Sequence, residues 1–129
     1  MRHQVLICDD AMFMRSVISS VLTSAGYEVV GEAATGDEAV ARYTELRPDV
    51  VTMDLLMPGM GGLDALKAIR ATSPDARIVI CSAMGQEPLI QQALNAGAAA
   101  FVVKPFKSEG LLEAVAKALR GDAIKEGVA

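Results

Sequence analysis

Three carboxylates, one hydroxyl and one ammonium group occur in this sequence at the ends of short apolar runs. Asp9 and Asp10 follow the first run, Asp54 follows the third, Ser82 the fourth and Lys104 the fifth. Each residue alone has an ordinary explanation, since Asp10 could cap a helix and Lys104 could be a solvated charge. Five such residues at the ends of runs are far less expected by chance, so the pattern indicates one functional site.

A cluster of three carboxylates carries an electrostatic cost. At about 5 Å separation and an effective dielectric constant near 20, each pair of like charges repels by roughly 3 kcal/mol. Lys104 supplies only one compensating charge, whereas a divalent cation would balance the cluster. The available ligands are hard oxygen atoms, with no His or Cys beside them, which favours Mg²⁺ over Zn²⁺. Mg²⁺ bound by few carboxylates usually recruits a phosphate oxygen, so the cluster indicates phosphoryl chemistry.

Phosphoryl transfer needs an in-line nucleophile and fixed positive charge around the phosphoryl oxygens. Asp54 lies on the central apolar run and is the best candidate nucleophile. Lys104 and the metal ion would neutralise the incoming group, and Ser82 could donate a hydrogen bond to one of its oxygens. The glycine-rich segment 57–62 lets the backbone turn tightly beside this site.

The five apolar runs alternate with five amphipathic stretches along the chain. Four of the runs are almost continuously apolar, which is typical of parallel strands covered on both faces, whereas Glu28 in the second run indicates an edge strand. Strict alternation of strands and helices predicts a doubly wound parallel sheet. Ligands of such sheets bind outside the carboxyl ends of the strands. The predicted strands are residues 5–8, 27–30, 50–53, 78–81 and 101–103.

Helices are expected in the stretches between and after these strands. Thr35 with Glu38 fits a capping box at the start of the second helix, and Ser108 is placed to cap the fifth. Beyond the fifth helix the sequence has little apolar surface to bury. We therefore expect one domain over residues 1–120, followed by a frayed tail over residues 121–129.

The bulk composition fits a single domain and excludes some classes of protein. The chain has 129 residues, 52 % of them hydrophobic, and a formal net charge of −4. An acidic chain is a poor match for nucleic acid, and no apolar run approaches the roughly 20 residues needed for membrane insertion. The start of the chain shows no signal-peptide pattern. Cys8 and Cys81 lie in apolar runs and are expected to be free buried thiols, which favours the cytoplasm.

The motifs resemble the response-regulator receiver family over residues 5–119, almost the whole chain. The resemblance implies an α/β fold with a five-stranded doubly wound parallel sheet of the flavodoxin-like type, strand order 2-1-3-4-5, and five helices. The motifs that carry it are Asp9-Asp10 after a strand, Asp54 before Met57-Pro58 and Gly62, Ser82-Ala83 after a strand, and Lys104-Pro105-Phe106.

The resemblance also implies roles for the acidic residues. Asp54 would accept the phosphoryl group. Asp10 would bind Mg²⁺ directly, and Asp9 would act largely through water. The backbone carbonyl of Leu56 would be a third protein ligand of the ion.

The remaining motif residues would belong to the switch. Ser82 and Lys104 match the hydroxyl and the lysine that family members place beside the phosphoryl group, and the Lys104–Pro105 bond would be cis. Phe101 stands where many members have Tyr, so the aromatic ring that swings inward is kept without its hydroxyl. Movement of Ser82 toward the phosphoryl group would vacate space for Phe101.

Residues 9–15 and 81–86 further resemble receivers that act alone in chemotaxis. This narrower resemblance implies a histidine kinase as phosphodonor and a flagellar motor switch protein, or another downstream protein, as target. A phosphatase is a further expected partner. We expect a monomer that catalyses only its own phosphorylation and dephosphorylation. The alternative is a receiver of a different relay, or one that drains phosphate from a kinase.

Three other functions fit the sequence less well. A phosphatase with an aspartyl nucleophile usually needs a second acid two residues later, and that position is Leu56. A flavin-binding module would need a phosphate loop after the first strand, where Asp9 and Asp10 would repel a phosphate. A receiver-like module that is never phosphorylated would not need the complete set of acids.

Overall fold

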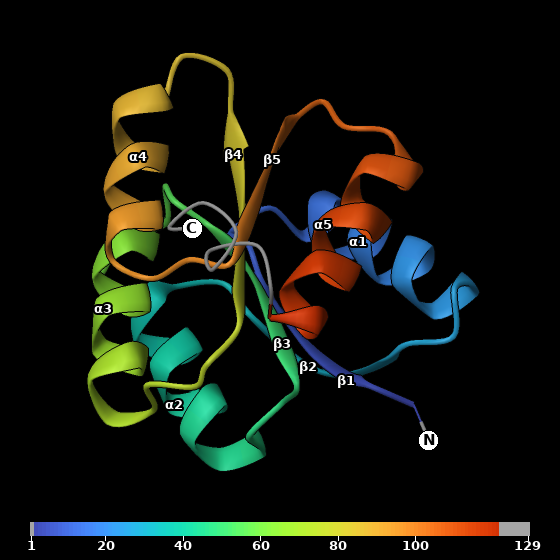
Figure 1. Cartoon of the computed structure of the whole chain (residues 1–129), viewed down its shortest axis with the longest axis horizontal. Coiled ribbons are helices and arrows are strands. Elements are labelled where there is room, and N and C mark those ends of the chain that lie inside the picture. Colours follow the sequence, from blue (N-terminus) through green and yellow to red (C-terminus); the bar gives the residue numbers. More distant parts are fainter. Residues whose placement is uncertain (1, 122–129) are drawn as a thin grey trace.

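A five-stranded parallel sheet forms the centre of the molecule, and helices cover both of its faces (Figure 1). The computed structural model describes residues 2–121. The strand order is β2-β1-β3-β4-β5, so the predicted doubly wound fold and its strand order are confirmed. In chain order the elements are β1 (Gln4–Cys8), α1 (Met12–Ser24), β2 (Glu28–Ala33), α2 (Gly36–Leu46), β3 (Val50–Asp54), α3 (Gly62–Thr72), β4 (Ile78–Ala83), α4 (Glu87–Asn95), β5 (Ala100–Lys104) and α5 (Ser108–Arg120).

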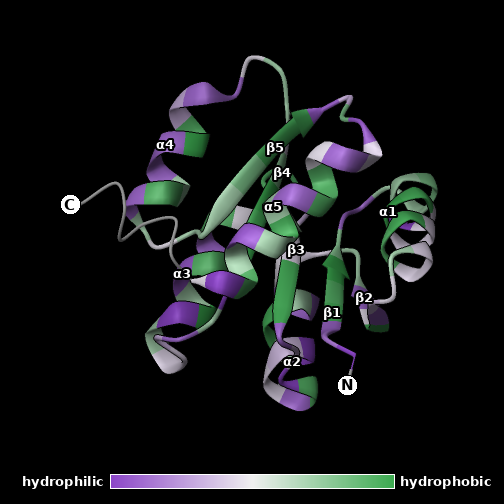
Figure 2. Cartoon of the chain, turned by 45° about the vertical axis from the view of Figure 1, so that its right-hand side comes forward, coloured by the Kyte–Doolittle hydropathy of each residue, from purple (hydrophilic) through white to green (hydrophobic). Residues whose placement is uncertain are grey.

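Two apolar cores hold the layers together, one on each face of the sheet. Helices α2, α3 and α4 pack on one face and contribute residues such as Tyr43, Leu66 and Ile90. Helices α1 and α5 pack on the other and contribute residues such as Leu22 and Leu111. The central strands are apolar on both sides, which Figure 2 shows as continuous green ribbons. This burial explains why the sequence shows continuous apolar runs in place of alternation.

The strands extend slightly beyond the predicted runs. β2 covers Glu28–Ala33, so it begins one residue later and ends three residues later than the predicted strand 27–30. It lies at the edge of the sheet, as Glu28 indicated. Asp54 and Lys104 are the last residues of their strands, and Ser82 is the last residue but one of β4. Asp54, Ser82 and Lys104 therefore lie within the carboxyl ends of their strands, whereas Asp9 and Asp10 follow the end of β1.

Two predicted helix caps have different outcomes. The Glu38 amide donates to Thr35 Oγ1 at 3.1 Å, and the Ala34 amide donates to Glu38 Oε1 at 2.8 Å, so the cap of α2 is confirmed. The predicted cap of α5 is wrong, because Ser108 is already helical. Lys107 precedes it without a side-chain capping bond. The sequence pattern identified the helix but placed its start one residue late.

The two thiols lie on opposite faces of the sheet. Cys8 belongs to the core under α2, α3 and α4, whereas Cys81 belongs to the core under α1 and α5, and both are free as predicted. No helix among residues 2–121 is long and apolar enough to cross a membrane. The frayed tail was predicted over residues 121–129, of which 122–129 lie outside the described part of the chain, so its fraying stays a prediction.

Candidate phosphoryl-transfer site

Four neighbouring strands bring the candidate residues to one edge of the sheet. β1 is followed by Asp9 and Asp10, β3 ends at Asp54, β4 carries Ser82 and β5 ends at Lys104. Because the strands are parallel, their carboxyl ends meet at this edge. The structure therefore places together all five residues that the sequence selected.

Lys104 links the two buried carboxylates of the site. Its Nζ lies 2.7 Å from Asp9 Oδ2 and 3.4 Å from Asp54 Oδ2. Asp9 is 1 % exposed and Asp54 is 8 % exposed, so water screens these charges poorly. The long lysine side chain reaches from β5 past β4 to contact acids on the far side of that strand.

The third carboxylate, Asp10, is exposed and completes the acidic group. One carboxylate oxygen from each of Asp9, Asp10 and Asp54 lies within 4.8 Å of the other two. The Ala11 amide donates to Asp9 Oδ1 at 2.9 Å, which fixes the turn between β1 and α1. Asp10 does not cap α1, because the capping position is Ala11 and no side chain bonds there. The ordinary explanation for Asp10 is thus wrong.

Arg15 supports this turn and was not selected from the sequence. Its Nη1 donates to the Asp9 carbonyl at 2.7 Å, and its Nε donates to Glu32 Oε1 at 2.8 Å. The side chain is 15 % exposed, so α1 is tied to both β1 and β2 by a largely buried guanidinium. The sequence signal was a charge placed among the apolar residues of an amphipathic helix.

A tight turn after β3 brings the backbone close to the nucleophile candidate. The Leu56 amide donates to Asp54 Oδ1 at 3.3 Å, and the Gly62 amide donates to the Leu55 carbonyl at 2.9 Å. A Cβ at Gly62 would lie 2.0 Å from the Asp54 carbonyl oxygen, so only glycine fits there. A hollow of about 420 Å³ opens beside this turn, lined by Asp10 and residues of 55–61.

Burial and neighbouring charges shift two pKa values at the site. Burial raises the pKa of Asp54, and repulsion from Asp9 adds to this effect, while attraction to Lys104 opposes it. Burial lowers the pKa of Lys104, but the hydrogen bond to Asp9 and the charges of Asp54 and Asp9 raise it more. Lys104 therefore stays charged, while an ionised Asp54 is held at some electrostatic cost.

Ser82 and Phe101 lie next to this cluster in different environments. Ser82 is 0 % exposed, and its hydroxyl donates to Gln86 Oε1 and approaches the Ala83 carbonyl at 3.3 Å. Phe101 is 45 % exposed on β5, so its ring is only partly covered. The contact with Gln86 was not expected from the sequence.

A model of the response regulator receiver domain matches residues 5–116 of the chain. Together with the fold and the acidic edge of the sheet, this match defines the class of protein: the chain belongs to the response regulator receiver family.

Individual relatives extend this assignment. The chain is 52 % identical over 117 residues to chemotaxis protein CheY of Thermotoga maritima, covering 91 % of this chain and 98 % of that protein. It is 50 % identical over 119 residues to CheY of Bacillus subtilis, covering 92 % and 99 %. The predicted resemblance to receivers that act alone in chemotaxis is therefore confirmed.

Solved structures show the same fold. CheY in a CheX–CheY complex with BeF3 and Mg from Borrelia burgdorferi has a TM-score of 0.84 and 36 % identity, covering 88 % of this chain and 86 % of that one. The response regulator domain of Thermotoga maritima CheB has a TM-score of 0.85 and 36 % identity, covering 93 % and 98 %.

Proposed function

We propose that this receiver accepts a phosphoryl group on Asp54 from a histidine kinase, with Mg²⁺ bound at the acidic cluster. The observation that carries the proposal is the contact of Lys104 Nζ with both Asp9 and Asp54 at the carboxyl edge of the sheet. Transfer would form a bond between an Asp54 carboxylate oxygen and phosphorus, while the bond from phosphorus to the donor breaks. Lys104 would hold positive charge beside the phosphoryl oxygens during that step.

The acidic group fits a hard divalent ion. Its three carboxylate oxygens lie within 4.8 Å of one another, close enough for one hard cation to be held among them directly or through water. Three carboxylates near one ammonium leave excess negative charge, and a bound Mg²⁺ would neutralise it and the phosphoryl oxygens. Asp10 and Asp54 would bind the ion directly, Asp9 through water, and the Leu56 carbonyl would be a further ligand.

The proposed output runs through a partner protein. Ser82 would move toward the phosphoryl group, and Phe101, now partly exposed, would turn into the space left behind. The changed surface would be that of α4, β5 and α5. Relatives named as chemotaxis proteins support a flagellar motor switch protein as the target.

The CheX–CheY complex of Borrelia burgdorferi supports a phosphatase as an additional partner. We place the protein in the cytoplasm as a monomer, with one receiver domain over residues 1–120. It would catalyse only its own phosphorylation and dephosphorylation. A receiver in another relay, or one that drains phosphate from a kinase, would use the same site with a different partner.

The test is covalent labelling by a small phosphodonor. Acetyl phosphate with Mg²⁺ should add one phosphoryl group to the wild type, detected by intact-protein mass spectrometry and located at Asp54 by peptide mapping. Asp54→Asn should stay unlabelled because an amide is not a nucleophile. Asp75→Asn, which alters an exposed acid far from this edge, should label like the wild type. Full labelling of Asp54→Asn would refute the assignment.

A further inference from the structure

The side chain of Gln86 reaches back from the start of α4 to the end of β4. Its Oε1 accepts hydrogen bonds from the Ser82 hydroxyl and, at 3.0 Å, from the Ala83 amide. Ser82 is fully buried, so water does not offer its hydroxyl an easy alternative. One glutamine oxygen thus holds both the hydroxyl and the adjacent backbone of the candidate switch.

The hydroxyl of Ser82 has only one hydrogen to donate. In this structure that hydrogen is directed to Gln86, with the Ala83 carbonyl as a more distant acceptor at 3.3 Å. A phosphoryl oxygen on Asp54 would need the same hydrogen. The two acceptors therefore compete, and binding to one excludes a full hydrogen bond to the other.

From this competition we infer that Gln86 is a positioning residue that holds Ser82 in the resting arrangement, and that phosphorylation of Asp54 must break the Ser82–Gln86 hydrogen bond. The inference rests on the proposed function and adds a residue to it. It also connects the site to α4, because Gln86 directly precedes that helix. Release of Gln86 would free the start of α4 when Ser82 moves.

The same turn contains a contact that does not involve Ser82. The Gly85 amide donates to Glu87 Oε2 at 3.3 Å, and Gly85 has a φ of +90°, which favours glycine. Glu87 therefore steadies the turn without competing for the hydroxyl. This difference makes Glu87 a matched control for Gln86.

The experiment is a calorimetric titration of the full chain with beryllofluoride in the presence of Mg²⁺. Gln86→Leu removes the competing acceptor. This variant should bind beryllofluoride about three- to tenfold more tightly than the wild type does, which is the range expected for one hydrogen bond. Gln86→Ala should shift affinity in the same direction. Gln86→Glu keeps an acceptor oxygen and should show no gain, and Glu87→Leu should stay within about twofold of the wild type.

A double-mutant cycle separates this competition from a general loosening of the turn. In a Ser82→Ala background there is no hydroxyl to release, so adding Gln86→Leu should not change the affinity. A gain of the same size without the hydroxyl would overturn the inference. So would unchanged affinity in both Gln86→Leu and Gln86→Ala. Failure of the wild type to bind beryllofluoride would instead refute the proposed function.

Discussion

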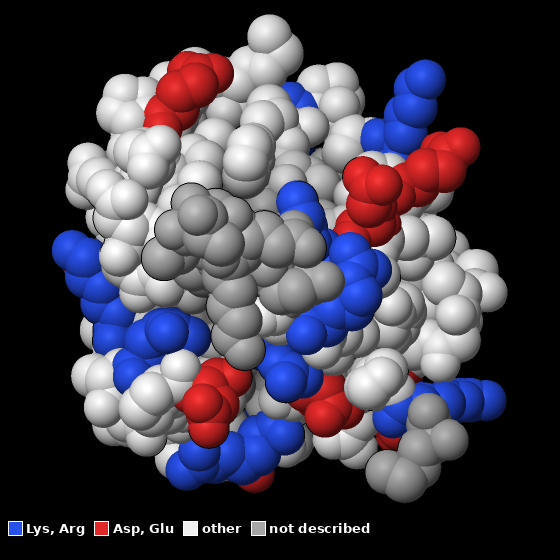
Figure 3. All heavy atoms as spheres, viewed as in Figure 1, with Lys and Arg blue, Asp and Glu red and all other residues white. Residues whose placement is uncertain are grey.

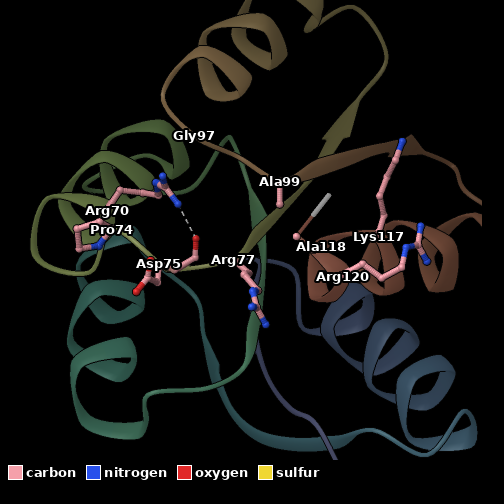
Figure 4. Close-up of a pocket in the computed structure, with 11 residues that line it drawn as sticks. Arg70, Pro74, Asp75, Arg77, Gly97, Ala99, Lys117, Ala118 and Arg120 are labelled. Atoms are coloured by element: carbon pink, nitrogen blue, oxygen red, sulfur yellow. Dashed lines mark hydrogen bonds between the residues drawn. The ribbon is translucent and has the colours of Figure 1, made fainter. Parts of the chain in front are cut away.

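The two edges of the sheet each carry a hollow and a group of charged side chains, but the charges are arranged differently. At the amino edge, a hollow of about 480 Å³ is lined by Arg70, Arg77, Lys117 and Arg120 beside a single acid, Asp75. Figure 4 shows that Lys117, Arg120 and Arg77 point in different directions, while Arg70 donates to the Ala76 carbonyl at 2.8 Å. Basic and acidic side chains are also interspersed over the face in Figure 3.

At the carboxyl edge the hollow is smaller, about 420 Å³, yet the charges beside it converge. Asp9 and Asp54 are buried, and one ammonium group contacts both of them. Burial makes such an arrangement of charges costly unless a ligand or ion binds there, whereas the exposed side chains of Arg77 and Lys117 at the amino edge are solvated at little cost. Converging buried charge, and not the size of a hollow, therefore distinguishes a candidate site.

The largest expected effect separates two lysines, one from each edge. Lys104→Ala should slow phosphorylation by acetyl phosphate about 100-fold or more, because positive charge beside the phosphoryl oxygens is lost. Lys117→Ala should label at the wild-type rate, since that side chain is exposed at the amino edge. Time courses by intact-protein mass spectrometry give both rates. Equal slowing of the two variants would remove the distinction between the edges.

The next largest effect is on Mg²⁺ binding, and it compares one acid from each edge of the sheet. Asp10→Ala should weaken Mg²⁺ binding about tenfold or more, because an exposed carboxylate of the acidic group is lost. Asp75→Ala should leave the affinity unchanged. Calorimetric titration of both variants with Mg²⁺ measures the difference. Matching affinities for Asp10→Ala and the wild type would sink the proposed metal site.

The fold and the carboxyl edge were predictable because their signals are local. Continuous apolar runs report strands buried on both faces, and position at a strand end is enough to bring Asp54 and Lys104 to one edge. The start of α5 was misplaced because the preference of serine for the capping position does not exclude it from the first helical turn, where Ser108 lies. Boundaries depend on small energy differences that one residue type does not decide.

The roles of Arg15 and Gln86 could not be predicted in the same way. Both depend on where a long side chain turns, and a sequence does not specify a rotamer. Arg15 bonds to Glu32 across 17 residues, a pairing that exists only once β2 lies beside β1. Gln86 contacts Ser82 because the intervening turn folds back. Contacts of this kind come from tertiary structure.

The smallest effect concerns stability and should have a definite sign. Burial raises the folded-state pKa of Asp54, whereas an unfolded aspartate titrates near 3.9. The folded protein is therefore favoured while the group is protonated, and this advantage is lost as pH rises through the folded pKa. Without Mg²⁺, Asp54→Asn should be more stable than the wild type by about 1 kcal/mol at pH 7.5. The difference in free energy of unfolding between the two proteins should decrease as the pH falls toward 4.5.

The matched change at the amino edge is Asp75→Asn, which should alter stability by less than about 0.5 kcal/mol because the side chain is exposed. Urea unfolding in EDTA, followed by circular dichroism at both pH values, measures both variants. Added Mg²⁺ should restore the wild type relative to Asp54→Asn, since the ion neutralises the charge that burial disfavours. If the wild type were more stable than Asp54→Asn in EDTA at pH 7.5, the attraction between Lys104 and Asp54 would outweigh the cost of burying the ionised carboxylate. The carboxyl edge would then be a balanced ion-pair network without excess charge, and the electrostatic case for a cation there would fail.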